Sequence, residues 1–445
     1  MQTQTYSGPA SEIERRTMRR VAWRLMPFLM LSYFIAYVDR VNIGFAALQM
    51  RDDIGVSEAV FGFGGTLFFI AYVIFEIPSN MALQRAGARL WIARIMISWG
   101  LVGIGASLVI GPWSFYASRF LLGAAEAGFF PGVILYLTYW FPRAYRARVL
   151  ATFMVAIPFS SFLGSPLSAL LLELDGVAGL RGWQWLFIVE SVPAILLGAL
   201  ALGVLTSRPR DAAWLREDER AWLEAQLAQE EEATAGAPGE VGPTVLGMFR
   251  NKTVWALAVV YCGSSATSNA LSLWQPQILK SFQLSNLETG FLNMIPFGIA
   301  SIFMVLWGRY ADTTGERIWS TAMPLALTSG CLLLTLTTDS LAITMVLLSL
   351  ILVGNYAMKG PFWALSTESL PPHVTAAGIA AINAFAHLGT GGASALLGLI
   401  KEATGSFPLA LLPLAALTAA GAITVLLIGR KRKVAHFPAV LSARD

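Results

Sequence analysis

The stretch "GRYADTTGERIW", residues 308–319, decides the fold because its last part resembles a second stretch of the chain. Its last five letters, at 315–319, match "GARLW" at 87–91. Pro131 and Pro361 are separated by almost the same number of residues, which extends the correspondence along the chain. We therefore expect two halves of similar structure.

The sequence around this repeat is strongly apolar. Of its 445 residues, 56% are hydrophobic and 13% are charged, whereas a soluble globular chain has about 25% charged residues. A helix needs about 20 apolar residues to cross a bilayer. We therefore expect an all-α membrane protein with 12 transmembrane helices in two pseudo-symmetric six-helix bundles. The predicted runs lie near 22–48, 57–83, 90–110, 113–140, 147–172, 184–206, 252–280, 288–311, 318–337, 340–369, 375–400 and 406–429.

One polar stretch separates the halves. Its first part repeats apolar residues about every four positions, as one face of a helix does, and Asp211 is the predicted cap. The segment "ATAGAPGEVGP", 233–243, is rich in Gly and Pro and predicts a linker. The apolar positions of the helix are Trp214, Leu215, Trp222, Leu223 and Leu227. The expected organisation is an N-terminal bundle over 1–206, a cytoplasmic linker with an amphipathic helix over 207–250, a C-terminal bundle over 251–433 and a cytoplasmic tail over 434–445.

The basic residues predict the orientation in the membrane. The net charge is +4, but the Lys and Arg residues gather in alternate loops. Because such loops stay in the cytoplasm, both termini are expected there. The tail "GRKRK", 429–433, is more simply an orientation signal or a contact with anionic lipid than a nucleic-acid site. The basic clusters lie at 15–24, 85–94, 143–148, 208–220, 309–317 and 430–433.

Among the charged residues inside apolar runs of the first half, four form two groups. Asp39 and Arg40 are adjacent in "FIAYVDRVNIGFA", and Arg119 and Glu126 stand in "SRFLLGAAEAGFFPG". Each ionisable group at a helix centre costs on the order of 2.5–3.5 kcal/mol on insertion scales, so such groups are functional candidates. The second half has neutral residues at corresponding positions, among them Ser268 for Asp39 and Asn355 for Glu126. Lys359 is the charged exception in this half.

Helix geometry constrains these charges. Asp39 and Arg40 point about 100° apart and must find partners on other helices or in a cavity. Arg119 and Glu126 are about 10 Å apart along the helix axis, which leaves room between them. Tyr33, Tyr37, Arg40 and Gly44 share one helix face, which fits a pocket wall for an organic anion.

These residues suggest coupling of an anion to a proton. Arg40 and Arg119 can hold a carboxylate with forked hydrogen bonds. Asp39 and Glu126 are poor neighbours for an anion unless they are protonated, and burial opposes their ionisation while a nearby arginine favours it. They could therefore take up a proton with the anion. The structural alternative is a set of static salt bridges that lock the bundle.

Other polar residues in the spans have two interpretations each. Lys359 can touch an anionic substrate at a broken helix or extend to the interface. His387 can titrate near neutrality or simply pack in its span. Gln275, Trp363 and Asn383 suit substrate hydroxyls or rings, and each is equally suited to helix packing. Structural roles are expected for Glu76 and Glu190.

The sequence resembles the anion:cation symporter branch of the major facilitator superfamily. Gly308, Asp312, Gly315 and Arg317 fit the G-x-x-x-D-x-x-G-x-[RK] loop of that superfamily. The motifs that carry the closer resemblance are "YVDRVNIGFA" (37–46), "FEIPSN" (75–80), "ARLWIARIMISWG" (88–100), "SRFLLGAAEAGFFPG" (118–132), "GWQWLFIVE" (182–190), "RPRDAAWL" (208–215) and "KGPFWAL" (359–365).

The resemblance implies a function. Bacterial members import sugar acids, dicarboxylates or aromatic acids, generally with protons, across the bacterial cytoplasmic (inner) membrane. It implies that Asp39 and Glu126 are the proton-coupling residues and that Arg40 binds the substrate carboxylate. It also implies a site lined by Tyr37, Tyr72, Arg119, Gln275, Trp363 and Asn383. Ser191 and His387 depart from the usual family pattern, at positions where Gly and Asn are common.

The favoured function is therefore proton-coupled import of a small organic anion by alternating access. Two alternatives are proton-antiport efflux and a transporter-like sensor of an anion. Against efflux, "FLGSPLSALL" lacks the G-P-x-x-G-G stretch of many antiporters. An enzyme is least expected, because the sequence has no zinc pair, nucleotide loop or nucleophile–base set. We expect no cofactor beyond the coupling proton, no metal, no nucleic acid, and a chain that functions as a monomer in the lipid bilayer.

Overall fold

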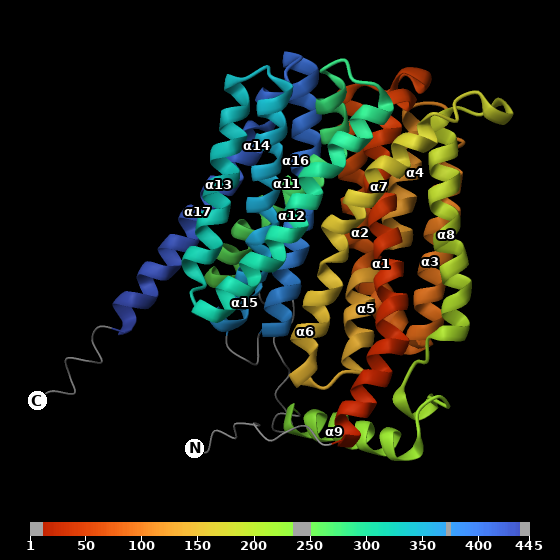
Figure 1. Cartoon of the computed structure of the whole chain (residues 1–445), viewed down its shortest axis with the longest axis vertical. Coiled ribbons are helices and arrows are strands. Elements are labelled where there is room, and N and C mark those ends of the chain that lie inside the picture. Colours follow the sequence, from red (N-terminus) through yellow and green to blue (C-terminus); the bar gives the residue numbers. More distant parts are fainter. Residues whose placement is uncertain (1–11, 235–250, 371–374, 437–445) are drawn as a thin grey trace, which may run out of the picture.

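The described part of the protein is a set of long helices in two bundles, and it contains no strand (Figure 1). The computed structural model describes residues 12–234, 251–370 and 375–436. The first bundle contains α1 (Glu12–Ile54), α2 (Glu58–Ala86), α3 (Ala88–Ala106), α4 (Pro112–Glu126), α5 (Phe129–Thr138), α6 (Arg143–Met154), α7 (Ala156–Leu172) and α8 (Gly182–Val204). The second contains α11 (Lys252–Lys280), α12 (Asn286–Thr314), α13 (Ile318–Leu334), α14 (Leu341–Ala357), α15 (Lys359–Ser369), α16 (Thr375–Thr404) and α17 (Phe407–His436). The predicted all-α, two-bundle architecture is confirmed.

Nine helical segments among the described residues are long and apolar enough to cross a membrane. The predicted runs 147–172, 252–280 and 375–400 fall outside that group. The first of these is interrupted at Val155, between α6 and α7, and leaves only a short apolar helix. The other two became α11 and α16, in which Ser, Thr and Gly lower the apolar content. Polar side chains are tolerated there because these helices pack on α1 and α2 of the other bundle.

One break within an apolar run of the first bundle has a counterpart in the second. In the first bundle this break lies at Ala127 and Gly128, three residues before Pro131. Gly128 has a φ of +85°, and a Cβ there would lie 2.3 Å from Ser79 Oγ, so only glycine fits without strain. The second bundle has the corresponding break between α14 and α15, at Met358. The two halves thus share an interruption, which lies three residues before Pro131 in one half and three residues before Pro361 in the other.

The bundles contact each other through small residues at the end opposite α9, the upper end in Figure 1. A Cβ on Gly44 would lie 2.7 Å from the Ser272 carbonyl, and one on Gly62 would lie 2.5 Å from the Ser394 carbonyl. Hydrogen bonds reinforce this contact, including Asn293 Nδ2 to Ser165 Oγ at 2.7 Å. The bundles are therefore closely packed at this end.

The polar stretch between the halves forms α9 (Glu217–Thr234), which crosses the lower end of the first bundle (Figure 1). The predicted cap was wrong: Asp211 ends a short 3₁₀ turn, η2 (Pro209–Asp211), and α9 begins six residues later. Glu219 serves the helix start instead, because its Oε2 accepts a hydrogen bond from the Arg216 backbone N–H at 3.1 Å. Leu215 and Leu223 are buried, as the apolar pattern indicated. The predicted linker segment over 235–250 and the tail from 437 lie outside the described residues.

Candidate functional site

Helix α1 directs its two adjacent charges into different surroundings. Asp39 is 7% exposed and accepts hydrogen bonds from Trp99 Nε1 at 2.7 Å and from Asn42 Nδ2 at 3.3 Å. Arg40 Nε donates to Glu126 Oε1 at 2.6 Å. The prediction that these neighbours find separate partners is confirmed. Asp39 therefore rests against neutral donors, and Arg40 against a carboxylate.

The Arg40–Glu126 ion pair connects α1 to the last residue of α4, just before the break. The Arg40 side chain is 16% exposed and that of Glu126 is 5% exposed. Aromatic rings surround the guanidinium: Tyr37 at 4.9 Å, Tyr72 at 5.5 Å and Phe68 at 5.8 Å. Rings in these positions attract a cation without neutralising it. Arg40 is thus held by one carboxylate and remains partly accessible.

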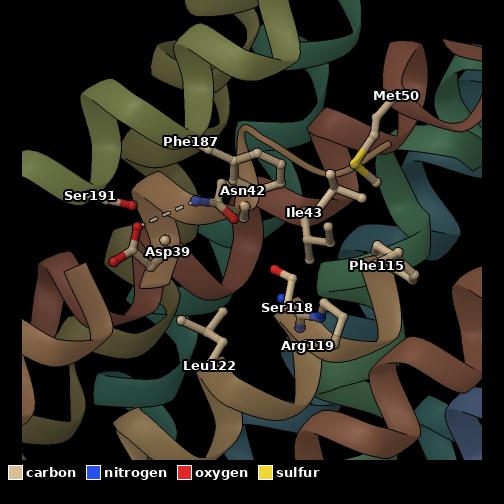
Figure 2. Close-up of a pocket in the computed structure, with 13 residues that line it drawn as sticks. Asp39, Asn42, Ile43, Met50, Phe115, Ser118, Arg119, Leu122, Phe187 and Ser191 are labelled. Atoms are coloured by element: carbon tan, nitrogen blue, oxygen red, sulfur yellow. Dashed lines mark hydrogen bonds between the residues drawn. The ribbon is translucent and has the colours of Figure 1, made fainter. Parts of the chain in front are cut away.

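Arg119 occupies a separate position in the first bundle. It is 7% exposed, and its guanidinium lies 5.1 Å from the Phe68 ring. It lines a cavity of about 10 Å³ whose wall also includes Asp39, Asn42 and Ser191 (Figure 2). That volume is roughly the room needed for one water molecule. Arg119 therefore shares a cavity wall with Asp39 and forms no ion pair with Glu126.

The second bundle has neutral residues at the positions that correspond to Asp39 and Glu126. Ser268 and Asn355, which correspond in sequence to Asp39 and Glu126, contact each other directly through Asn355 Nδ2 and Ser268 Oγ. Lys359 Nζ donates to the same Ser268 Oγ at 3.1 Å and lies 4.2 Å from the Tyr356 ring. Among the described residues, Lys359 forms no ion pair. The one charge that the sequence singled out in this half is therefore a half-buried cation.

The remaining predicted residues are distributed over both bundles. His387 on α16 stacks on Phe69 at 5.7 Å and contacts Tyr72 at 5.1 Å, so it reaches the first bundle. Trp363 packs on Tyr261 at 4.7 Å, and Asn383 is half-buried on α16.

Two predicted residues lie apart from these groups. Gln275 is fully buried, and neither of its amide atoms has a hydrogen-bond partner in the described part of the chain. Tyr33 corrects an expectation: it packs against Phe153 at 4.1 Å and is 3% exposed, so it is a core residue and not a pocket wall.

The structure adds residues that the sequence interpretation missed. Trp99 supplies the shortest hydrogen bond to Asp39, and Phe68 lies against both arginines. Asn42 could have been found, because it stands one helical turn after Asp39. Trp99 and Phe68 carry no comparable signal, since an aromatic residue in an apolar run usually indicates packing.

Glu190 and the loop at 308–319 each form contacts that indicate a structural role. Glu190 is 3% exposed, and its Oε1 accepts a hydrogen bond from Ser168 Oγ at 2.7 Å. In the loop, Arg317 bonds the Asp312 carboxylate at 2.9 Å and the Ala311 carbonyl at 3.0 Å. Gly315 ends α12 with a φ of +67°. The loop motif thus fastens a helix end and lies outside the candidate site.

Similar proteins were found among bacterial transporters. One is a protein of Agrobacterium vitis named "Putative tartrate transporter", 46% identical over 94% of this chain and 96% of the relative. Another is the "Putative metabolite transport protein NicT" of Pseudomonas putida, 38% identical over 87% of this chain and 88% of the relative. A third is the "Quinolone resistance transporter" of Acinetobacter baumannii, 36% identical over 89% of this chain and 91% of the relative.

The fold has counterparts among solved structures. A D-xylose–proton symporter matches with a TM-score of 0.71 at 17% identity, covering 91% of this chain and 96% of that chain. The sequence model of the Major Facilitator Superfamily matches residues 29–394, which extend from α1 of the first bundle into α16 of the second. The chain is therefore a membrane transporter and not an enzyme, and it belongs to the Major Facilitator Superfamily.

Proposed function

We propose that this protein imports a small organic anion together with protons. The observation that carries the proposal is the Arg40–Glu126 ion pair, in which the arginine side chain remains partly exposed. An incoming carboxylate needs the same guanidinium, so it must displace Glu126. Protonation of Glu126 removes its charge and releases Arg40 for the anion. The similarity to a protein named a tartrate transporter supports an organic acid as the substrate.

Arg40 is the residue best suited to hold the substrate carboxylate. Its guanidinium can form two parallel hydrogen bonds with a carboxylate once Glu126 has left. Tyr37 and Tyr72 flank it and offer hydroxyl groups to the remainder of the substrate. We assign the second-bundle side of the site to Lys359, Trp363, Asn383 and His387, with Arg119 and Gln275 as supporting residues.

Asp39 is the second proton-coupling residue in this proposal. Its carboxyl is buried and, among the described residues, accepts hydrogen bonds only from the neutral donors Trp99 and Asn42. No cation forms an ion pair with it there, and a buried carboxylate without an ion pair is costly, so the proposal has Asp39 carry a proton for part of the cycle. The small cavity beside it, shared with Arg119, gives a water molecule a place from which to exchange that proton.

Transport follows from alternation of the two bundles about the site. The bundles are packed together at the end opposite α9. We place both termini in the cytoplasm of a bacterium, so in this proposal the packed end faces the periplasmic side of the inner membrane. A single chain contains both bundles and both sides of the site. We therefore propose that the monomer transports the substrate and functions in the lipid bilayer without a partner protein.

The test is uptake by purified protein in proteoliposomes. Glu126→Gln should abolish accumulation of the anion driven by an inward proton gradient while leaving anion binding or counterflow exchange intact, because Gln cannot cycle a proton. Glu224→Gln, an exposed residue of α9, is the matched control and should transport normally. Full uphill uptake by Glu126→Gln would refute the assignment.

Efflux by proton antiport is a second candidate, favoured by the similarity to a protein named a quinolone resistance transporter. The same vesicles distinguish the two. An inward proton gradient accumulates the substrate of a symporter inside, whereas it expels the substrate of an antiporter.

A further inference from the structure

A cleft with a basic wall lies on the first part of α1. The side chains that line it, which we call the basic cleft, are Arg16, Arg19, Arg20, Trp23 and Arg24. Its volume is about 410 Å³. The five positions recur at intervals of three and four residues, so they share one face of the helix. The opposite face, which includes Val21 and Leu25, is fully buried. The basic cleft therefore faces away from the core of the protein.

Helix α9 holds two of these arginines in place. Glu219 pairs with Arg16 at 2.9 Å and with Arg20 at 2.6 Å, and Asp218 also pairs with Arg16. Glu219 is itself fully buried, so it fixes both side chains against the body of the protein. This part of the basic cleft is therefore ordered before any ligand arrives, which lowers the entropic cost of binding.

The other two arginines of the cleft have no opposite charge. Arg19 and Arg24 are exposed, and neither forms an ion pair within the residues that the structure describes. The Arg24 guanidinium lies 5.9 Å from the Trp214 ring, which attracts a cation without neutralising it. Four guanidinium groups thus stand against two carboxylates, which leaves a surplus of two positive charges. The ligand that fits this surplus is an anion, and phosphate matches the guanidinium geometry well.

The basic cleft lies where α1 enters the membrane. No charged residue stands between Arg24 and Asp39, so the apolar part of the helix begins at the cleft. The 43 residues of α1 are about twice the number needed to cross a bilayer, and the first turns extend toward α9 (Figure 1). Trp23 is 77% exposed, and an exposed tryptophan at the end of an apolar run is typical of the lipid headgroup layer. An anion in the cleft would therefore lie at the depth of the lipid phosphates.

We propose that the basic cleft binds the headgroup of an anionic phospholipid. The lipid phosphate contacts Arg19 and Arg24, and the acyl chains extend past Trp23 along the apolar part of α1. A zwitterionic lipid leaves the positive surplus uncompensated, so the cleft prefers an anionic one. A water-soluble phosphate gains the charge contact but not the apolar contact with Trp23, so the lipid is favoured over it. This site is separate from Arg40 and Glu126 and does not depend on which solute is transported.

The experiment measures lipid binding to the full-length protein in detergent by native mass spectrometry. Equal amounts of phosphatidylglycerol and phosphatidylethanolamine with the same acyl chains are added. The wild type should retain at least fivefold more of the anionic lipid. Glycerophosphoglycerol, which is the same anionic headgroup without acyl chains, should not displace it at a hundredfold excess.

Arg19→Gln combined with Arg24→Gln should reduce the preference for phosphatidylglycerol to less than twofold. The two lysine replacements at the same positions keep the charge and should retain the preference. The matched control is Lys252→Gln combined with Arg309→Gln, because these exposed residues of α11 and α12 remove the same charge outside the cleft. Size-exclusion elution establishes that each variant is folded, and the single glutamine variants serve if the double variant is not.

Trp23 gives a second, independent measurement. Phosphatidylglycerol with brominated acyl chains quenches the emission of nearby tryptophans. The quenching should be weaker in Trp23→Phe than in the wild type, because an exposed tryptophan beside the bound lipid has been removed.

Three results would overturn the inference. The first is equal retention of the two lipids by the wild type. The second is an equal loss of preference in the cleft variant and in the control, which would show that only net charge matters. The third is displacement of the lipid by glycerophosphoglycerol, which would make the cleft a site for soluble phosphates. None of them bears on anion transport through Arg40 and Glu126, which Glu126→Gln tests separately.

Discussion

At the scale of single residues, burial of charge is compensated in different ways along the chain. Arg40 has a carboxylate, Asp39 has two neutral hydrogen-bond donors, and Lys359 has a hydroxyl and a ring. The sequence located all three residues, because a charge inside an apolar run stands out. The sequence could not show that Arg40 pairs with Glu126 or that Asp39 bonds to Trp99. Each of these contacts joins two helices, and the sequence of one helix does not determine how it is rotated against another.

Arg40→Lys tests whether the forked geometry matters for the substrate. Lysine keeps the charge but cannot form two parallel hydrogen bonds with a carboxylate. We expect anion affinity to fall at least tenfold, about 1.4 kcal/mol, with the protein still folded. The measurement is the dissociation constant by calorimetry, and unchanged affinity would remove Arg40 from the site.

Substitution of Glu190 tests whether its buried carboxyl has a structural role. Its Oε1 accepts from Ser168, and its other oxygen has no hydrogen-bond partner among the described residues. Glu190→Gln preserves an acceptor for Ser168 and should change stability by less than about 1 kcal/mol. Glu190→Ala leaves the buried hydroxyl unsatisfied and should cost about 1–3 kcal/mol. Thermal unfolding in detergent compares the two, and a Gln variant less stable than the Ala variant would contradict this role.

At the scale of elements, the break between α4 and α5 positions the candidate site. Glu126 is the last residue of α4, and Gly128 turns the chain with a φ of +85°. Pro131 and Gly132 permit a bend in this region, but they do not fix where the helix breaks. The position is set by the approach of Ser79 on α2, a tertiary contact that the sequence does not reveal.

Gly128→Ala should therefore impair both stability and transport. A side chain at this φ costs about 1–3 kcal/mol of strain, and its Cβ would also meet Ser79 Oγ. Gly105→Ala, on α3, is the matched control, because nothing lies within 4 Å of its added Cβ. Unfolding temperature and uptake are the measurements, and equal behaviour of the two variants would show that the break tolerates a side chain.

The helix α9 is tied to the first bundle through Glu219. Its carboxylate is fully buried and pairs with Arg16 at 2.9 Å and Arg20 at 2.6 Å, both on α1. The apolar pattern predicted this helix, but the sequence misplaced its start because both Asp211 and Glu219 have side chains that can serve a helix N-terminus.

Glu219→Gln should loosen α9 by removing the charge that two arginines share. Because the arginines are about one-third exposed, solvent screening limits the expected cost to roughly 1–2 kcal/mol. Faster amide hydrogen exchange in α9 than in the control Glu224→Gln would support this, whereas identical exchange would show that apolar contacts alone hold the helix.

At the scale of the whole molecule, the repeat and the apolar runs were sufficient to predict two bundles. They were insufficient to show which helices form the contact between bundles, because lipid-facing and bundle-facing residues are similarly apolar. The contact is instead recognisable by its small residues, Gly44, Gly62 and Gly398 among them. Because these residues are small, the backbones of the two bundles can approach closely at the packed end.

Gly398→Val should shift the molecule away from this state. A Cβ at this position would lie 2.5 Å from the Glu58 carbonyl on α2, so the bundles must separate there. Gly392→Val on the same helix is the control, since nothing lies within 4 Å of that position. Pulsed electron resonance between spin labels on α2 and α16 at this end should report longer distances only for Gly398→Val, and unchanged distances would refute the prediction.

The ring of His387 has a consequence for how such motion proceeds. It lies flat on Phe69 and beside Tyr72, while Tyr72 borders the guanidinium of Arg40. Flat rings slide over one another without breaking a directional bond, whereas Asn293 and Ser165 must part completely. If the bundles alternate as proposed, this ring contact can therefore persist while the hydrogen bonds of the packed end break.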